Sequence, residues 1–318
     1  MTGRTGVLVM AHGTPDSADE IGPFYTRIRR GRPPPPELLD ELTGRYEAIG
    51  GTSPLTARTR AQVDGLATRL EAARPGRYVV RLGTKYVHPT IEEGMAELVA
   101  EGVDGVVGVV LTPHQSSMGS GAYFDRAGAA AAELSVGLTV VPSWHRAQAF
   151  APILAARTRV ALDGLEPVAR RRTAVFFTAH SLPERVVAEG DPYPDQVAES
   201  GADVAALLDL DADPTVTWGT AWQSAGRTAD PWIGPDLLVE MERVAAAGAT
   251  AVVVCPVGFV SDHLEILYDL DIEAQDKADA LGIAFARTTS LNDDPDFLAM
   301  LAGVVIAAGD GAAGDGAA

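Results

Sequence analysis

Short apolar segments alternate along this chain with longer segments of helical periodicity, and this alternation limits the fold more than any other feature of the sequence. Segments 106–111 and 250–255 are apolar almost throughout, as expected of strands covered on both faces. Strands separated by helices form parallel sheets with helices on each side. The pattern therefore predicts an α/β protein, with strands at residues 7–11, 78–82, 106–111, 138–141, 173–178, 215–219, 250–255 and 284–287.

The two halves of the chain resemble each other. Strand 7–11 is followed by His12 and strand 173–178 leads to His180, each histidine preceded by alanine. A length of 318 residues suits two domains of about 150 residues each. We therefore expect two similar Rossmann-like domains with a ligand between them, beyond the carboxyl ends of the strands. The expected division is residues 1–164, residues 165–308 and, with nothing to bury, a disordered tail at residues 309–318.

Composition excludes several classes of protein. A formal net charge of −18 opposes binding to nucleic acid. No apolar run reaches the ~18 residues of a membrane-spanning helix, and the first residues lack the ordered regions of a signal peptide, so we expect a cytoplasmic protein without membrane contact. The single cysteine, Cys255, excludes an internal disulfide and a cluster held by several thiolates of this chain. The acidic surface favours a monomer.

His180 lies where an apolar strand gives way to a loop, which is where α/β folds collect functional side chains. A neutral imidazole at this position can bind a transition metal or accept a proton near neutral pH. The alternative is a structural histidine that hydrogen-bonds the start of the next helix. Position alone leaves both interpretations open.

Three acidic residues recur every four positions along a predicted helix: Glu265, Asp269 and Glu273. This spacing places them on one face, where they could pass a divalent cation inward from solvent. Two other interpretations compete. Asp262 could cap the helix with Glu265 as its capping-box partner, and Asp269 and Glu273 could form a solvated face.

Arginines and aromatic residues offer a second kind of site. A basic cluster could grip carboxylates, because guanidinium pairs with them in a planar bidentate geometry, although a solvated run of charge is the default alternative. Large aromatic side chains offer flat apolar surface to a planar ligand, although most of them only pack. The basic residues are Arg27, Arg29, Arg30 and Arg32, with Arg45 beside Tyr46 further on, and the aromatic residues are Tyr123, Tyr193, Trp218, Trp222 and Trp232.

Six segments spread over the chain are together typical of one family. They are residues 28–32 (IRRGR), 45–55 (RYEAIGGTSPL), 179–184 (AHSLPE), 190–196 (GDPYPDQ), 222–224 (WQS) and 256–265 (PVGFVSDHLE). In this order the segments resemble the ferrochelatases. The chain is most similar to the coproporphyrin III ferrochelatases of Gram-positive bacteria.

The resemblance implies two Rossmann-like domains and a lyase that inserts Fe²⁺ into coproporphyrin III, forming coproheme in haem biosynthesis. It implies that His180 and Glu265 hold the incoming iron and help to remove two pyrrole protons, and that Asp269 and Glu273 mark the path by which the metal enters. The residues expected to position the macrocycle are Arg29, Arg45, Tyr46, Ser53 and Tyr123. The implied partners are coproporphyrin III, ferrous iron and the haem-pathway enzymes before and after this step.

The sequence departs from the family pattern at His12, where the coproporphyrin enzymes usually have a tyrosine that contacts the product iron. Imidazole binds iron at least as readily. The Ala-His-Gly ending of the first strand also fits a cobalt or iron chelatase for sirohydrochlorin. A non-catalytic iron-porphyrin carrier, with His12 as a lasting axial ligand, is a third interpretation. Because related enzymes with an iron–sulfur cluster use several cysteines, we expect no cluster and no permanently bound cofactor.

Overall fold

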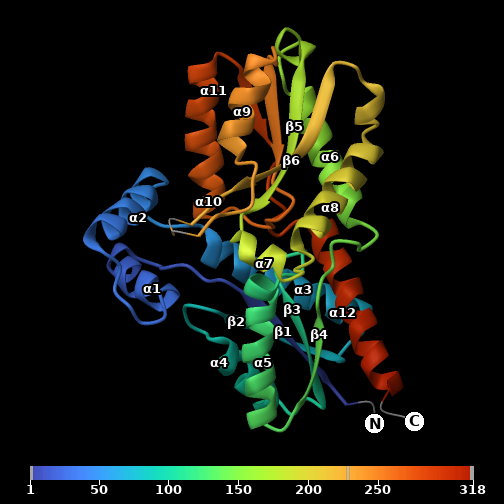
Figure 1. Ribbon diagram of the computed structural model, residues 1–318. Coiled ribbons are helices and arrows are strands. Elements are labelled where there is room, and N and C mark those ends of the chain that lie inside the picture. The colour runs from blue at the N-terminus through green and yellow to red at the C-terminus, as the bar shows by residue number, and fades with distance from the viewer. Residues whose placement is uncertain (1–2, 227, 229, 316–318) are drawn as a thin grey trace.

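Residues 3–226, 228 and 230–315 are described by the computed structural model, residues 312–315 by their backbone alone. The chain forms two stacked lobes, each built on a four-stranded parallel sheet with helices on its faces (Figure 1). The strand order is β2-β1-β3-β4 in the first sheet and β6-β5-β7-β8 in the second. Because the second order repeats the first, the predicted α/β class with two similar Rossmann-like units is confirmed.

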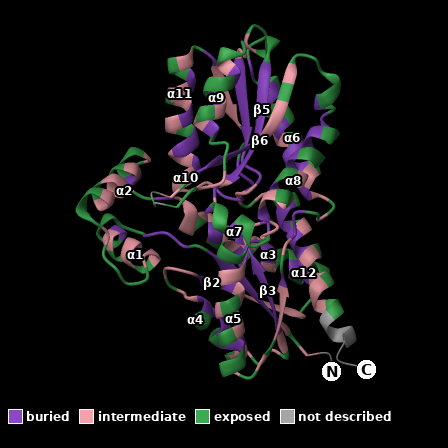
Figure 2. Cartoon of the chain, viewed as in Figure 1, coloured by how far each residue is buried: buried purple, intermediate pink, exposed green. Residues whose placement is uncertain are grey.

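Each of the eight predicted strands is present, within a few residues of the predicted bounds. The strands are β1 (Thr5–Ala11), β2 (Tyr78–Thr84), β3 (Gly105–Val110), β4 (Gly137–Val141), β5 (Thr173–His180), β6 (Val216–Gln223), β7 (Ala251–Cys255) and β8 (Ala284–Arg287). The central strands β1 and β7 are buried almost throughout, and Figure 2 shows that buried residues concentrate in both sheets and on the helix faces turned toward them. Burial of β-branched residues on both faces explains why the apolar runs predict these strands.

Helices fill the segments between the strands. The α-helices are α1 (Ile21–Ile28), α2 (Pro36–Ala48), α3 (Leu55–Ala73), α4 (Ile91–Ala100), α5 (Ala122–Glu133), α6 (Phe150–Asp163), α7 (Glu184–Ala188), α8 (Tyr193–Leu207), α9 (Leu237–Ala246), α10 (Leu264–Leu267), α11 (Gln275–Leu281) and α12 (Pro295–Asp315). Two π-helices, η2 (Ser117–Gly121) and η5 (Asp269–Ala274), precede α5 and α11. No helix in these described ranges is long and apolar enough to cross a membrane.

The last helix returns to the first lobe. Helix α12 packs against α3, β3 and β4 (Figure 1), with Phe297, Leu301 and Val305 fully buried. The rings of Phe297 and Trp144 lie 5.8 Å apart. A division of the chain at residue 164 assigns this segment to the second domain, whereas its side chains complete the core of the first.

The sequence predicts a disordered tail from residue 309 onward, and the structure continues α12 through residues 309–315. Gly309 lets the helix approach the first sheet, because a Cβ at this position would lie 3.3 Å from the hydroxyl oxygen of Tyr78. Arg74 and Asp310 form an ion pair of 3.9 Å. These contacts supply what composition alone did not reveal. The rest of the predicted tail, residues 316–318, lies outside the described residues.

Candidate active site

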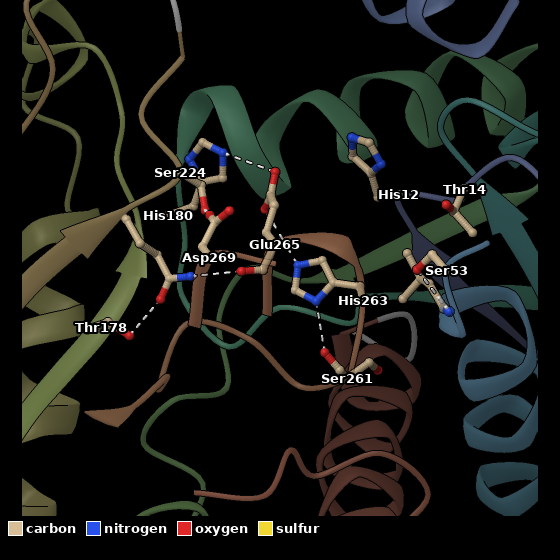
Figure 3. A network of polar contacts seen from close by, with 12 residues as sticks. His12, Thr14, Ser53, Thr178, His180, Ser224, Ser261, His263, Glu265 and Asp269 are labelled. Atoms are coloured by element: carbon tan, nitrogen blue, oxygen red, sulfur yellow. Dashed lines mark hydrogen bonds and ion pairs between the residues drawn. The ribbon is translucent and has the colours of Figure 1, made fainter. Parts of the chain in front are cut away.

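The two residues predicted to handle metal meet at the edge of the second sheet. His180 is the last residue of β5, and Glu265 lies in α10, which follows the loop after β7. His180 Nε2 and Glu265 Oε1 are 3.6 Å apart, and both side chains are about one-third exposed. Figure 3 shows the imidazole and the carboxylate turned toward each other. The pairing expected across the sequence is therefore found in space.

A second histidine contacts the same carboxylate. His263 Nε2 lies 3.5 Å from Glu265 Oε2, and His263 Nδ1 donates a hydrogen bond of 2.9 Å to the carbonyl of Ser261. His180 Nδ1 likewise donates to the carbonyl of Ser181. Because a carbonyl oxygen only accepts, Nδ1 carries the hydrogen in both rings and Nε2 is left to face Glu265. Sequence reasoning missed His263, although it lies two residues before Glu265.

The charges of this group stabilise one another. Burial is the largest single effect and would lower the pKa of His180, but the Glu265 carboxylate, with smaller contributions from the Ser181 carbonyl and Asp269, raises this pKa to about 9. Burial would raise the pKa of Glu265, yet His180, and then His263, hold it well below its ordinary value. At neutral pH the pair is therefore an imidazolium facing a carboxylate.

Neighbouring residues hold the backbone of both partners. The register of the second sheet pairs His180 with Gln223, whose side-chain amide donates to the carbonyl of Glu265 at 3.2 Å. Thr178 donates to the Gln223 amide oxygen at 2.9 Å. The Tyr193 hydroxyl donates to the carbonyl of His180 at 3.1 Å. These bonds hold the end of β5 at His180 against the start of α10 at Glu265, as a preorganised site requires.

The carboxylate row extends from this pair toward solvent. Asp269 is 6% exposed, and it accepts hydrogen bonds from Ser224 and, at 3.3 Å, from Arg45 Nη1. Burial, followed by the charge of Glu265, raises the pKa of Asp269 to about 7, against the opposing effects of Ser224 and Arg45. Glu273 lies further out, 3.7 Å from Arg45. Asp269 is therefore not part of a solvated face.

The backbone of the row is not a simple α-helix. Residues 264–267 are α-helical, Asp269–Ala274 form the π-helix η5, and α11 follows. Four residues overshoot one α-helical turn and fall short of one π-helical turn, so the mixed segment keeps Glu265, Asp269 and Glu273 on one side. Asp262 does not cap the segment, because its carboxylate accepts from Ser290 and Asn292 instead. The capping interpretation is wrong.

A cavity of about 260 Å³ runs along this row. Its lining includes the carboxylates of Glu265, Asp269 and Glu273 together with Arg45 and Ser224. Arg45, which the sequence suggested as a grip for the macrocycle, is turned to these carboxylates and stacks on Tyr268, with 4.7 Å from its guanidinium carbon to the ring centre. The cavity thus joins the outer carboxylates to the His180–Glu265 pair.

The opposite wall belongs to the first lobe. His12 follows β1, is exposed, and lies across from Glu265 in Figure 3, with its ring 4.8 Å from that of Tyr86. Thr14 and the buried Tyr46 share a hydrogen bond of 3.0 Å. Burial raises the pKa of Tyr46 to about 12, and the charge of Glu265 adds to this effect. Residues of both lobes therefore surround one site.

The remaining predicted residues also belong to the first lobe. Ser53 is buried and accepts from the amide of Leu55 at 3.3 Å, and Tyr123 is in the first turn of α5, where burial raises its pKa. Arg29 follows α1, and its Nε is buried without a hydrogen-bond partner among the described residues. An unpaired buried donor is costly, which suits a group that binds an anionic ligand.

The sequence analysis did not predict one basic residue near the site, and it proposed more aromatic residues than lie there. Lys85 lies over the rings of Tyr86 and Tyr123, at 5.5 Å and 4.9 Å from their centres, and sequence reasoning gave no signal for it. Of the predicted aromatic residues, Trp232 lies 6.2 Å from the His180 ring. Trp218 instead packs on Phe177 in the core of the second lobe.

Within the described ranges, no group of three or more His, Cys, Asp and Glu residues is arranged to hold a metal ion. A closed structural site uses about four protein ligands, whereas an ion that must leave needs fewer. The His180–Glu265 pair offers two ligand atoms and leaves the other coordination positions open.

Comparison with known proteins identifies a family over nearly the whole chain. The family description "Ferrochelatase" matches residues 4–308. A ferrochelatase of Herpetosiphon aurantiacus is 41% identical over 307 residues, which are 96% of this chain and 99% of that protein. A coproporphyrin III ferrochelatase of Bacillus mycoides is 38% identical over 310 residues, covering 96% and 98% of the two chains.

Solved structures share the fold at much lower identity. SirB from Bacillus subtilis with Fe³⁺ superposes with a TM-score of 0.57 at 12% identity, covering 98% of each chain. CbiX, described as the terminal enzyme for biosynthesis of siroheme in denitrifying bacteria, gives 0.52 at 14% identity, covering 95% of this chain and 98% of the other. Fold and family agree: the chain belongs to the ferrochelatase family and is a metal-inserting lyase.

Proposed function

We propose that the protein inserts Fe²⁺ into coproporphyrin III, forming coproheme and releasing two protons. The observation that carries this proposal is the His180–Glu265 pair beside a cavity lined by Glu265, Asp269 and Glu273, with His12 across from Glu265. Relatives named for this reaction, such as that of Bacillus mycoides, support the choice of substrate.

The chemistry requires the residue types found here. A porphyrin presents four nitrogens, two of which carry protons, so insertion needs a base and metal ligands that release the ion. Glu265 and the Nε2 of His180 would hold Fe²⁺ at the face of the macrocycle. Because ligands must be deprotonated, a dication that takes the Glu265 carboxylate competes with the imidazolium and drives the proton off His180. When the ion passes from His180 Nε2 to the pyrrole nitrogens, that imidazole nitrogen is free to accept a pyrrole proton.

The cavity would supply the metal. Carboxylates bind divalent cations in stages, and Glu273, Asp269 and Glu265 line or approach a continuous space. The raised pKa of Asp269 makes its charge responsive near neutral pH, so an arriving dication would stabilise its ionised form. This path leaves the opposite side of the cleft for the macrocycle.

Residues of the first lobe would position the four propionates. Arg29 has a buried unpaired Nε, and Tyr46, Ser53 and Tyr123 add hydroxyl groups from the same lobe. Carboxylates are the groups that guanidinium and hydroxyl donors recognise. The Arg45 guanidinium, which pairs with Asp269 and Glu273, would act mainly on the metal path.

His12 favours a second candidate. An exposed imidazole facing the metal-handling wall could ligate the product iron, which fits a sirohydrochlorin chelatase or an iron-porphyrin carrier as well as a coproporphyrin enzyme. Single-cysteine composition supports an enzyme without an iron–sulfur cluster or other resident cofactor, and we propose that it acts as a monomer in the cytoplasm between the haem-pathway enzymes that make its substrate and use its product.

The test is an anaerobic assay of purified protein with Fe²⁺ and coproporphyrin III, followed by the absorption spectrum of the metalloporphyrin. Protoporphyrin IX and sirohydrochlorin are assayed in parallel. We expect the highest kcat/KM with coproporphyrin III. No conversion above the protein-free blank would refute the function, and faster metallation of sirohydrochlorin would favour the second candidate.

Two histidine variants test the assigned roles. In His180→Ala, turnover should fall by about 10²-fold or more while coproporphyrin still binds, because one ligand and the base are lost together. The matched control is His88→Ala, since His88 is 83% exposed and lies outside the site. Equal turnover in the two variants would overturn the role of His180.

A further inference from the structure

Helix α8 of the second lobe is joined to loops of the first lobe by a row of polar contacts. The Gln115 amide donates to Gln196 Oε1 at 2.7 Å, and His114 Nε2 lies 2.8 Å from Ser200 Oγ. Glu199 pairs with Arg146 at 2.7 Å and with His145 at 3.0 Å. We call this set of residues the α8 clasp. From the second lobe it contains Asp191, Gln196, Glu199 and Ser200, and from the first lobe His114, Gln115, Ser116, Ser117, His145 and Arg146.

Asp191 makes the most contacts at one end of the α8 clasp, just before the helix. Its Oδ2 accepts from the Ser117 amide at 2.6 Å, from Ser117 Oγ at 2.7 Å and from Ser116 Oγ at 3.3 Å. Its Oδ1 accepts from the Tyr193 amide at 3.0 Å. One carboxylate therefore takes three donors from the first lobe and one from the second.

The residues that donate to Asp191 connect it to both walls of the cleft. Ser117 begins η2, which runs directly into α5 and Tyr123, on the wall proposed to position the macrocycle. Tyr193 begins α8, and its hydroxyl donates to the carbonyl of His180 at 3.1 Å. The path from Tyr123 to His180 runs along the backbone of residues 117–123, through the hydrogen bonds of Asp191, and then through the side chain of Tyr193.

We propose that Asp191 is a positioning residue that sets the separation of the cleft walls and so the fit of the carboxylated porphyrin. The proposal rests on the proposed function. Hydrogen bonds to a charged acceptor are stronger than those between neutral groups, and loss of the acceptor leaves the Ser117 amide and two hydroxyls without it. The contacts of Gln196, Glu199 and Ser200 remain, so the lobes stay together while the cleft end of the clasp loosens.

Loss of the Asp191 carboxylate should affect the binding of porphyrin and not the binding of metal. Ser117 and Tyr193 lie on segments leading to the macrocycle wall and to the backbone of His180, whereas the side chains of His180 and Glu265 keep their own pairing. In Asp191→Ala we expect the Kd of iron-free coproporphyrin III to rise about tenfold, discounted for partial exposure of the bonds. The KM for Fe²⁺ should stay within about twofold of the wild-type value.

The test compares Asp191→Ala, Asp191→Asn and the control Asp195→Ala. Asn keeps an oxygen that can accept from Ser117, so it should restore most of the affinity. Asp195 is an exposed carboxylate on the first turn of the same helix, and its removal should leave affinity unchanged. Binding is measured by fluorescence titration with iron-free coproporphyrin III, and KM for each substrate by anaerobic turnover.

A ligand-free readout separates this proposal from the proposed function. Amide hydrogen exchange of residues 116–121 should be faster in Asp191→Ala than in the wild type and in Asp195→Ala, because the Ser117 amide loses its acceptor. Unchanged exchange and unchanged porphyrin affinity would overturn the role of Asp191 even if the enzyme is active. A wild-type protein that fails to metallate coproporphyrin would refute the function instead, whatever the exchange result.

Discussion

Replacing Glu265 by glutamine removes the charge that faces two histidines while keeping the size of the side chain. Burial lowers the pKa of His180, and the Glu265 carboxylate is the largest effect that raises it, to about 9. In the variant burial acts against only the weaker contributions of the Ser181 carbonyl and Asp269. We therefore expect the pKa of His180 to fall below its ordinary value of 6.5.

The size of the change makes it measurable. At pH 8 the His180 imidazole is about 90% protonated with a pKa of about 9, and less than about 5% protonated once the pKa is below 6.5. The same substitution should reduce kcat/KM for Fe²⁺ by about 10²-fold or more, since the anionic ligand is lost along with the partner of the base.

Nitrogen NMR of histidine-labelled protein, free of metal and porphyrin, follows each of the six histidines through a pH titration. The signal of His180 is assigned by its absence from His180→Ala. Glu273→Gln is the control, because Glu273 is not among the groups that shift His180. A His180 that still titrates near 9 in Glu265→Gln would refute the explanation of the pair by mutual charge.

Three further predictions concern stability. Burial would raise the pKa of Asp294, but hydrogen bonds from the Phe297 amide and Arg157 hold it below 3.8. Asp294→Ala should therefore lower the free energy of unfolding by about 1 kcal/mol at neutral pH. The difference from wild type should vanish as pH falls through the lowered pKa. Phe297→Ala should lower the free energy of unfolding by about 3–5 kcal/mol, because the ring is fully buried. Gly94→Ala should destabilise, since its Cβ would lie 2.4 Å from a backbone oxygen, whereas Gly128→Ala has open space and should stabilise by up to about 1 kcal/mol.

Denaturant unfolding of each variant beside the wild type measures these differences. A pH-independent effect of Asp294→Ala would contradict the assigned ionisation, and a loss well under 2 kcal/mol for Phe297→Ala would show that α12 contributes little to the first lobe. Equal effects of the two glycine substitutions would contradict the packing described for α4 and α5.

The strands and the nearness of His180 to Glu265 could be predicted from the sequence. Apolar runs such as 106–111 carry the mark of a strand buried on both faces, wherever the sheet lies. His180 follows such a strand, so topology alone brings it to the edge where ligands bind. Glu265 needed the family motif as well, because its spacing fits a helix cap equally well.

The remaining features depend on contacts that local sequence does not encode. An apolar helix face such as that of α12 does not specify which sheet it covers. Helix α12 covers the first sheet because of packing partners such as Trp144. A π-helix has no local signature comparable with a cap, so the shape of the carboxylate row was not foreseen. The turn of Arg45 toward Asp269 follows from the meeting of the two lobes.

The most direct test of the central claim is the position of iron in crystals soaked anaerobically with Fe²⁺, found by anomalous diffraction at the iron absorption edge. The account predicts a peak within bonding distance of His180 Nε2 and a carboxylate oxygen of Glu265, and predicts its loss in His180→Ala. Iron bound reproducibly elsewhere, with no density between these two side chains, would contradict it.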